Sequence, residues 1–160
     1  MSNSTFEAIF MRRSCRAYTG QKVGDETVAL LAKATLAAPS GSNAQPVNLI
    51  VVQNVPLILE LEKAVVDYFA KNGDETIRER IKSRKNKIFY DASTVFFLAV
   101  KNKAHIDAGI MSENLAIAAT SLGLANIILG LPGVIFNDPD PRRTGKKNSA
   151  SPKVMSTALP

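Results

Sequence analysis

The sequence has one cysteine and one histidine, Cys15 and His105, and it has no tryptophan. A single thiol cannot form a disulfide within the chain, which fits a reducing compartment such as the cytoplasm. Zinc sites need several Cys and His ligands, so this pair predicts no metal site. Residues 1–20 lack the apolar stretch of a signal peptide, and no apolar run approaches a membrane span. We therefore expect a cytoplasmic protein with no membrane partner.

The composition is that of a folded domain, with 46% hydrophobic and 21% charged residues among 160. This length can bury a core, and we expect one domain over residues 1–136. The net charge is +6, and residues 137–160 supply three of these charges, from five cations and two aspartates. A basic protein attracts phosphates, but no nucleic-acid motif accompanies the charge, so we expect no nucleic-acid partner. Because residues 137–160 have little apolar content, they predict an irregular basic tail.

Hydrophobic periodicity predicts helices that alternate with strands. The expected helices cover residues 25–38, 54–72 and 106–122. The expected strands are the buried apolar runs 47–53, 94–100 and 126–129. This pattern alone indicates an α/β or α+β domain.

Side chains at the helix ends support these boundaries. Asp25 and Asn54 are placed to cap two of the helices, and Asn72-Gly73 ends the second. The helix over 106–122 has few polar residues, so we expect it to be buried or to lie in a subunit interface.

A cluster of cationic side chains near the N-terminus is the first candidate site. The run Arg12-Arg13-Ser14-Cys15-Arg16 places three guanidinium groups and one hydroxyl within five residues. Guanidinium groups bind phosphate in bidentate fashion, and serine adds a short donor. Ser4 and Glu7 resemble a capping box, which places the run at the end of a short helix, where the chain becomes extended. The alternative is a solvated basic turn that binds nothing.

The second candidate is the loop 38–46, which reads Ala-Pro-Ser-Gly-Ser-Asn-Ala-Gln-Pro. It is dense in helix breakers and small polar residues, which let a backbone approach a ligand closely. The sequence has neither a GxGxxG turn after a strand nor a Walker loop. The residues therefore indicate a phosphate-bearing ligand without identifying it.

Taken together, these two segments resemble the opening motifs of the FMN-dependent nitroreductase family. Residues 12–18 resemble its RRSxRxF motif. Residues 38–46 resemble its APSGxNxQPW motif, with Val47 in place of the usual aromatic residue.

Three further segments continue the resemblance, so that it runs in order over residues 4–134. Residues 89–93 resemble FYxAP, with Ser93 in place of proline. Residues 107–124 are similar to the central-helix motif that ends in SLGLG, and residues 130–133 to a glycine-containing turn of the family.

The resemblance implies an α+β fold, in which a mixed β-sheet is flanked by helices within an obligate homodimer that holds FMN at the subunit interface. One subunit would bind the phosphate and ribityl chain through Arg12, Arg13, Ser14 and Arg16. The other would contribute Pro39, Ser40, Gly41, Asn43 and Gln45. The backbone from Ile128 to Gly130 would flank the isoalloxazine ring.

The implied activity is an FMN-dependent oxidoreductase with ping-pong kinetics. NAD(P)H would reduce the flavin, and a nitroaromatic, a quinone or a related small-molecule acceptor would reoxidise it. Hydride transfer needs no side-chain acid or base, so no catalytic residue is assigned. The candidate lid is 72–87, whose cations could attract an anionic acceptor or the NADPH phosphate; they are Arg78, Arg80, Lys82 and Arg84. The alternative for that segment is a solvated helix surface.

The C-terminal part departs from the family, whose members continue into an IPEGYEYGIAL-type segment that begins a further strand. Codons for Lys147 to Leu159, read two nucleotides out of frame, permit Lys-Phe-Ser-Ile-Pro-Glu-Gly-Tyr-Glu-Tyr-Gly-Ile-Ala. We hypothesise a frameshift between residues 137 and 147, in the gene or in its sequence record. Resequencing tests this, because synonymous codons that break the shifted motif would exclude it.

The altered C-terminus leaves two alternatives to an active enzyme. The family's last strand segment is expected to be missing, with one sheet edge unpaired and FMN affinity reduced. The first alternative is a flavin-binding-impaired dimeric remnant without activity. The second is a module that binds anionic ligands through the basic tail.

Overall fold

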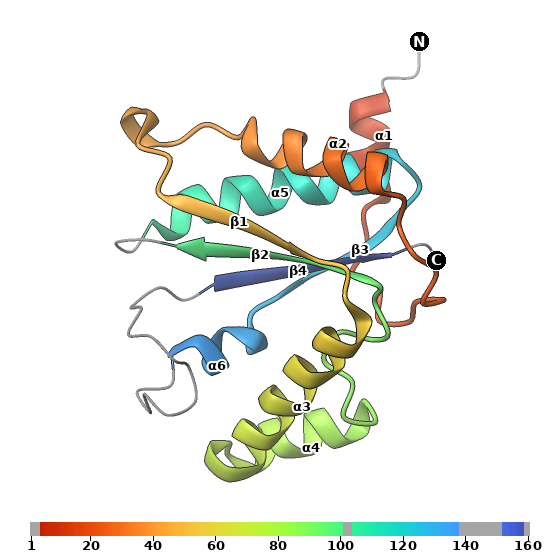
Figure 1. The fold of residues 1–160 in the computed structure, drawn as a ribbon, viewed down its shortest axis with the longest axis vertical. Coiled ribbons are helices and arrows are strands. Elements are labelled where there is room, and N and C mark those ends of the chain that lie inside the picture. The colour runs from red at the N-terminus through yellow and green to blue at the C-terminus, as the bar shows by residue number, and fades with distance from the viewer. Residues whose placement is uncertain (1–3, 101–103, 138–151, 159–160) are drawn as a thin grey trace.

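The computed structural model describes residues 4–100, 104–137 and 152–158. A four-stranded β-sheet forms the centre of the molecule (Figure 1). Its strands lie in the order β1-β2-β4-β3, and they are β1 (Val47–Val52), β2 (Thr94–Val100), β4 (Pro152–Ala158) and β3 (Ala125–Leu129). All three ladders are antiparallel, and a single parallel bridge joins Ser14 to Asn126 of β3. The predicted α+β fold is thus confirmed, and among the described residues parallel pairing is limited to that bridge.

Helices cover both faces of the sheet (Figure 1). One face carries α1 (Ser4–Met11), α2 (Asp25–Leu36) and α5 (His105–Ser121). The other carries α3 (Val55–Asn72), α4 (Glu75–Ser83) and α6 (Val134–Asn137). Two short 3-10 turns are η1 (Gly41–Asn43) and η2 (Leu131–Gly133). No helix within the described ranges has the length and apolar character to cross a membrane.

Six of the seven residues of strand β2 are buried, because helices cover both of its faces. Successive residues of a strand point to opposite faces of the sheet. Phe96 accordingly packs with Leu31 and Leu115 on the α2/α5 side. Phe97 packs with Ile58 on the α3 side. The prediction of a buried strand over 94–100 is confirmed.

The helix ends agree with the sequence at one cap and disagree at another. Asn54 caps α3 as predicted, because its side-chain oxygen accepts a hydrogen bond from the Leu57 N–H at 3.1 Å. The predicted Asp25 cap is wrong, since Gly24 holds the cap position and Asp25 is the first residue of α2. A carboxylate in the first turn still interacts favourably with the positive end of the helix dipole.

The expectation of an irregular tail is wrong for residues 152–158, which form β4. This strand pairs with β2 on one side and with β3 on the other, so the sheet has no gap at that position. Local sequence carries a weak strand signal there, but two open strand edges supply hydrogen-bond partners along the whole segment. Tertiary pairing therefore overrides the local pattern. Residues 138–151 lie outside the described residues.

Candidate functional site

The basic run leaves α1 and continues as an extended segment beside β3. Ser14 forms the parallel bridge with Asn126, and the Cys15 N–H donates to the Asn126 carbonyl at 3.0 Å. This confirms the prediction that the run lies where a short helix gives way to extended chain. The bridge holds the segment against the sheet edge, with Arg16 two residues farther along.

The arginines of this run interact with backbone carbonyls. Arg13 Nη1 donates to the carbonyls of Phe10 and Arg12, at 2.6 and 2.8 Å, and so caps the end of α1. Arg16 Nη1 lies 3.4 Å from the Ser14 carbonyl. Within the described ranges, none of Arg12, Arg13 and Arg16 forms an ion pair with a carboxylate. Their positive charge is therefore available to an external anion.

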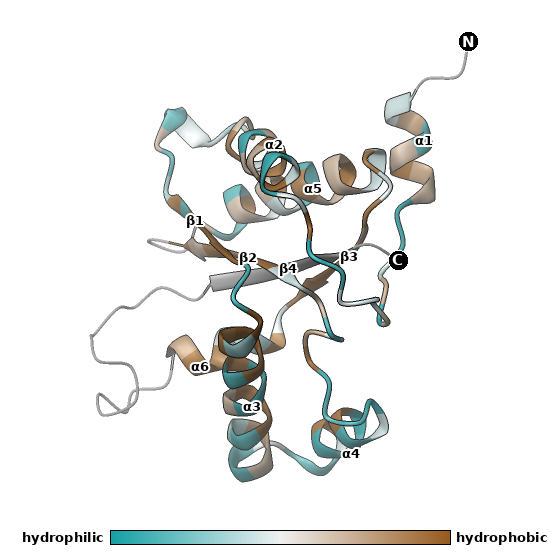
Figure 2. Ribbon diagram, turned by 45° about the vertical axis from the view of Figure 1, so that its right-hand side comes forward, coloured by the Kyte–Doolittle hydropathy of each residue, from teal (hydrophilic) through white to brown (hydrophobic). Residues whose placement is uncertain are grey.

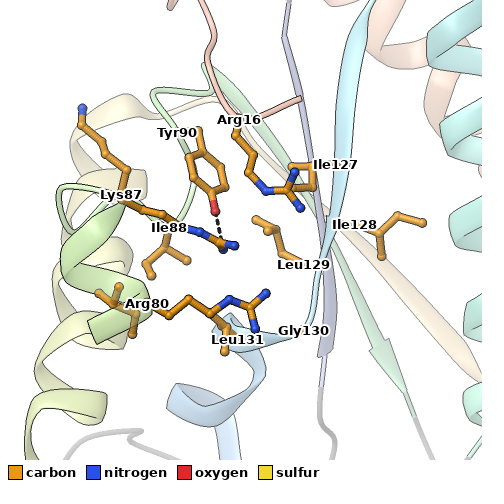
Figure 3. A pocket seen from close by; sticks show the side chains of 12 residues that line it. Arg16, Arg80, Lys87, Ile88, Tyr90, Ile127, Ile128, Leu129, Gly130 and Leu131 are labelled. Carbon is orange, nitrogen blue, oxygen red and sulfur yellow. Dashed lines mark hydrogen bonds between the residues drawn. The ribbon is translucent and has the colours of Figure 1, made fainter. Parts of the chain in front are cut away.

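A cavity of about 100 Å³ lies between β3 and α4 (Figure 3). Arg16 lines it from the extended segment, and Ile128 and Gly130 line it from the end of β3. Three predicted site residues from two distant parts of the sequence therefore meet here. On the α4 side the cavity is lined by Arg80, Arg84, Lys87 and Tyr90.

The α4 side of the cavity carries more positive charge than its local carboxylates neutralise. Lys87 forms an ion pair with Asp91, and this hydrogen bond raises the pKa of Lys87 above its usual value. Arg84 is half-buried and donates to the Tyr90 hydroxyl at 2.9 Å. Within the described ranges, Arg80 and Arg84 have no carboxylate partner. Lys87 and Tyr90 were not predicted as site residues, because their place depends on the fold of the turn after α4.

The small-residue loop before β1 is held by specific hydrogen bonds. The Gly41 N–H donates to Asp107 Oδ1 of α5 at 3.0 Å, and the Gln45 N–H donates to Ser40 Oγ at 3.0 Å. Three of its non-glycine residues have positive φ, namely Ser42 at 51°, Asn43 at 54° and Gln45 at 47°. Such conformations cost energy and tend to persist where function requires them.

One chain does not bring the two predicted FMN-binding groups together. The loop containing Pro39, Ser40 and Gly41 leads into β1, whereas the basic run lies beside β3. β1 and β3 are the two outer strands of the sheet, and the groups lie at opposite sides of the ribbon in Figure 1. In the part of the chain that the structure describes, no three His, Cys, Asp or Glu side chains gather as a metal site.

Comparison with solved structures finds the same fold in flavoproteins. The chain is 31% identical to a nitroreductase of Desulfitobacterium hafniense DCB-2 with bound FMN; the TM-score is 0.88, over 99% of this chain and 90% of that one. It is 27% identical to a nitroreductase of Bacteroides fragilis NCTC 9343 with bound FMN, with a TM-score of 0.87 over 99% and 89% of the chains.

Comparison with curated proteins agrees. An NADPH-flavin oxidoreductase of Vibrio harveyi is 28% identical over 129 residues, which are 80% of this chain and 54% of that protein. An Archaeoglobus fulgidus protein is 27% identical over 124 residues, which are 77% of this chain and 65% of that protein. The chain thus spans less than two thirds of the curated relatives it matches. The model of the nitroreductase family matches residues 9–134, and the chain belongs to this family.

Proposed function

We propose that this chain is the subunit of an FMN-dependent oxidoreductase that uses NAD(P)H to reduce nitroaromatic, quinone or related acceptors in the cytoplasm. The observation that carries the proposal is the convergence of Arg16, Ile128 and Gly130 on one cation-rich cavity. The relatives support it, because the D. hafniense and B. fragilis proteins were crystallised with FMN. The V. harveyi relative is named as an NADPH-flavin oxidoreductase.

The chemistry of the residues fits FMN. Arginines without carboxylate partners suit a dianionic phosphate, and the apolar end of β3 suits a planar ring. We assign the phosphate and ribityl chain to Arg12, Arg13, Ser14 and Arg16. We assign the ring to the edge from Ile128 to Gly130, where a Cβ on Gly130 would meet no atom within 4 Å. Bound flavin would accept hydride from NAD(P)H and pass it to the acceptor.

The residues of the chain then act by position and charge. The bridge between Ser14 and Asn126 fixes the basic run against β3, which holds its donors in place before a ligand arrives. Arg16 would stabilise negative charge that develops on a reduced ligand beside it. Ile127 and Leu129 are buried and limit the access of water from the sheet side.

A second copy of the chain would complete the site. The cavity of about 100 Å³ is smaller than the roughly 300–1,000 Å³ of small-molecule sites, so one chain provides part of one. The loop residues Pro39, Ser40, Gly41, Asn43 and Gln45 would come from the partner. Helices α1, α2 and α5 expose large apolar side chains, among them Phe10 (70%), Leu36 (59%) and Ile106 (80%). Exposed apolar surface of this kind marks protein interfaces, which supports a homodimer through this face.

The test is to purify the protein without added flavin, record its visible spectrum, and then add FMN and NADPH without oxygen. We expect a yellow protein with about one FMN per subunit that NADPH bleaches. Arg16→Gln should lose FMN affinity, whereas Lys71→Gln, an exposed cation on α3, should not. A wild-type protein that stays colourless and does not retain FMN would overturn the proposal and favour the inactive remnant.

A further inference from the structure

The two faces of α4 carry arginines with different surroundings. Arg80 of α4 and Arg84, the cap residue that follows the helix, both line the cavity beside β3. Arg78 and Lys82 lie on another side and line a separate groove with Phe69 of α3. Figure 2 shows α4 as largely hydrophilic, in contrast to the apolar β1 and β3. The helix therefore directs only part of its charge towards the candidate site.

The cavity-facing arginines differ from the other cations nearby in their charge balance. Lys82 is paired with Glu79, and Lys87 with Asp91. Arg80, Arg84 and Arg16 have no such partner among the described residues. Figure 3 shows the guanidinium groups of Arg16 and Arg80 turned towards the same space, beside the hydrogen bond from Arg84 to Tyr90. Like charges that converge in this way repel each other unless an anion lies between them.

The size of the cavity limits what it can hold. Its volume of about 100 Å³ is smaller than the roughly 150 Å³ of a protein cavity that holds one benzene molecule. That space accepts a single carboxylate or phosphate group rather than a whole ligand. Arg84 is half-buried, and its bond to Tyr90 orients the guanidinium group before a ligand binds.

We propose that Arg80 and Arg84 form a subsite for an oxyanion group carried by a reactant of the flavin, next to Arg16 of the cofactor site. The position beside Ile128 and Gly130 rests on the proposed function, which assigns those residues to the flavin ring. The shared chemistry is a carboxylate or phosphate that two guanidinium groups bind in bidentate fashion. Either the acceptor supplies this group as a carboxylate, or the electron donor NADPH supplies it as its 2′-phosphate.

The experiment compares matched pairs of reactants on the FMN-loaded protein. One pair is 4-nitrobenzoate and the neutral 4-nitrobenzamide, and the other is NADPH and NADH. The double variant R80Q/R84Q is compared with R78Q/K82Q, which makes the same charge change on the same helix. We expect R80Q/R84Q to lower kcat/KM about tenfold or more for the member of one pair that carries the extra oxyanion group, 4-nitrobenzoate or NADPH, with its other member within twofold of wild type. The pair that responds identifies the source.

Further variants and a binding measurement separate this role from a structural one. R80Q alone should show part of the loss without breaking the hydrogen bond between Arg84 and Tyr90. R84K should lose less than R80Q/R84Q, because lysine keeps the positive charge at position 84. Calorimetric titration with 4-nitrobenzoate and with 2′,5′-ADP, on the protein with and without FMN, should show the same loss in R80Q/R84Q. A protein that does not retain flavin, or does not reduce the neutral acceptor, would contradict the proposed function. The titration would still test the subsite in that case, because it needs neither flavin nor turnover.

Three results would overturn the subsite. The first is that R80Q/R84Q and R78Q/K82Q behave alike towards both pairs and both titrants. The second is that R80Q/R84Q reduces kcat/KM equally for charged and neutral reactants, which indicates a structural role. The third is that it weakens FMN about tenfold more than riboflavin, which assigns these arginines to the phosphate of the cofactor.

Discussion

Glu62 links helix α3 to the turn that follows α4, and its removal should cause a measurable loss of stability. This residue of α3 accepts hydrogen bonds from the backbone N–H groups of Ile88 and Phe89, at 2.5 and 2.8 Å. Ile88 and Phe89 are 3% and 1% exposed, so little solvent reaches their backbone. The turn that begins here leads to Tyr90, which lines the candidate site.

The expected cost follows from the two donors that lose their acceptor. A buried donor left without a partner costs about 1–3 kcal/mol. E62A should therefore lower the free energy of unfolding by roughly 2–6 kcal/mol, since two donors lose the same acceptor. E62Q keeps an oxygen acceptor but loses its charge, so it should cost about half as much.

The assay is urea denaturation at one fixed protein concentration, because association would shift the midpoint. E60A is the control, since Glu60 is an exposed residue of the same helix. Surface changes of that kind usually stay within about 0.5 kcal/mol. If E62A matched E60A, with unchanged slopes, the carboxylate would not hold the turn, and the reasoning would fail.

Three further predictions concern single side chains. Asn54→Ala removes the cap of α3 and should cost about 1 kcal/mol in urea denaturation, whereas Asn54→Ser should cost less. Gly73→Ala should destabilise the protein, because a Cβ would lie 2.6 Å from the Phe69 carbonyl oxygen, and stability at or above wild type would contradict this. Lys87 has a raised pKa in the folded state, chiefly through its hydrogen bond to Asp91. Its contribution to the stability of the fold is therefore full below the unfolded pKa of about 10.4, and it is lost as pH rises through the folded pKa. Its side chain is 38% exposed, so Lys87→Met should cost under about 1 kcal/mol at pH 7, and thermal unfolding should show that difference disappearing above about pH 10.4.

The central part of the fold could be predicted from the sequence because its signals are strong and local. The apolar run over 94–100 corresponds to β2 (Thr94–Val100), and the run over 126–129 lies within β3 (Ala125–Leu129). Asn54 caps α3 as its side chain suggests. The helix over 106–122 lacks a clear polar face, and the structure explains this by burying Leu115 and Ala116 completely.

Features that depend on distant contacts could not be predicted. Strand β4 forms because β2 and β3 each offer an edge, which residues 152–158 alone do not reveal. Glu62 has no sequence signal, since its partners Ile88 and Phe89 follow it by more than 20 positions. The charge run of α4 did not indicate which arginines face the cavity, because that depends on where β3 ends. The binding roles of all the residues assigned to FMN stay predictions.

The position of β4 has a consequence for how the protein is made. It is the last described element in the chain, yet it lies between β2 and β3 in the sheet. During synthesis from the N-terminus, β2 and β3 emerge first, and each has an open edge of unpaired backbone groups until β4 arrives. Pairing between such distant segments is slow, and open edges invite association with other chains. A nascent chain stalled before residue 152 should therefore depend on chaperones, although every helix of the described fold has already been made.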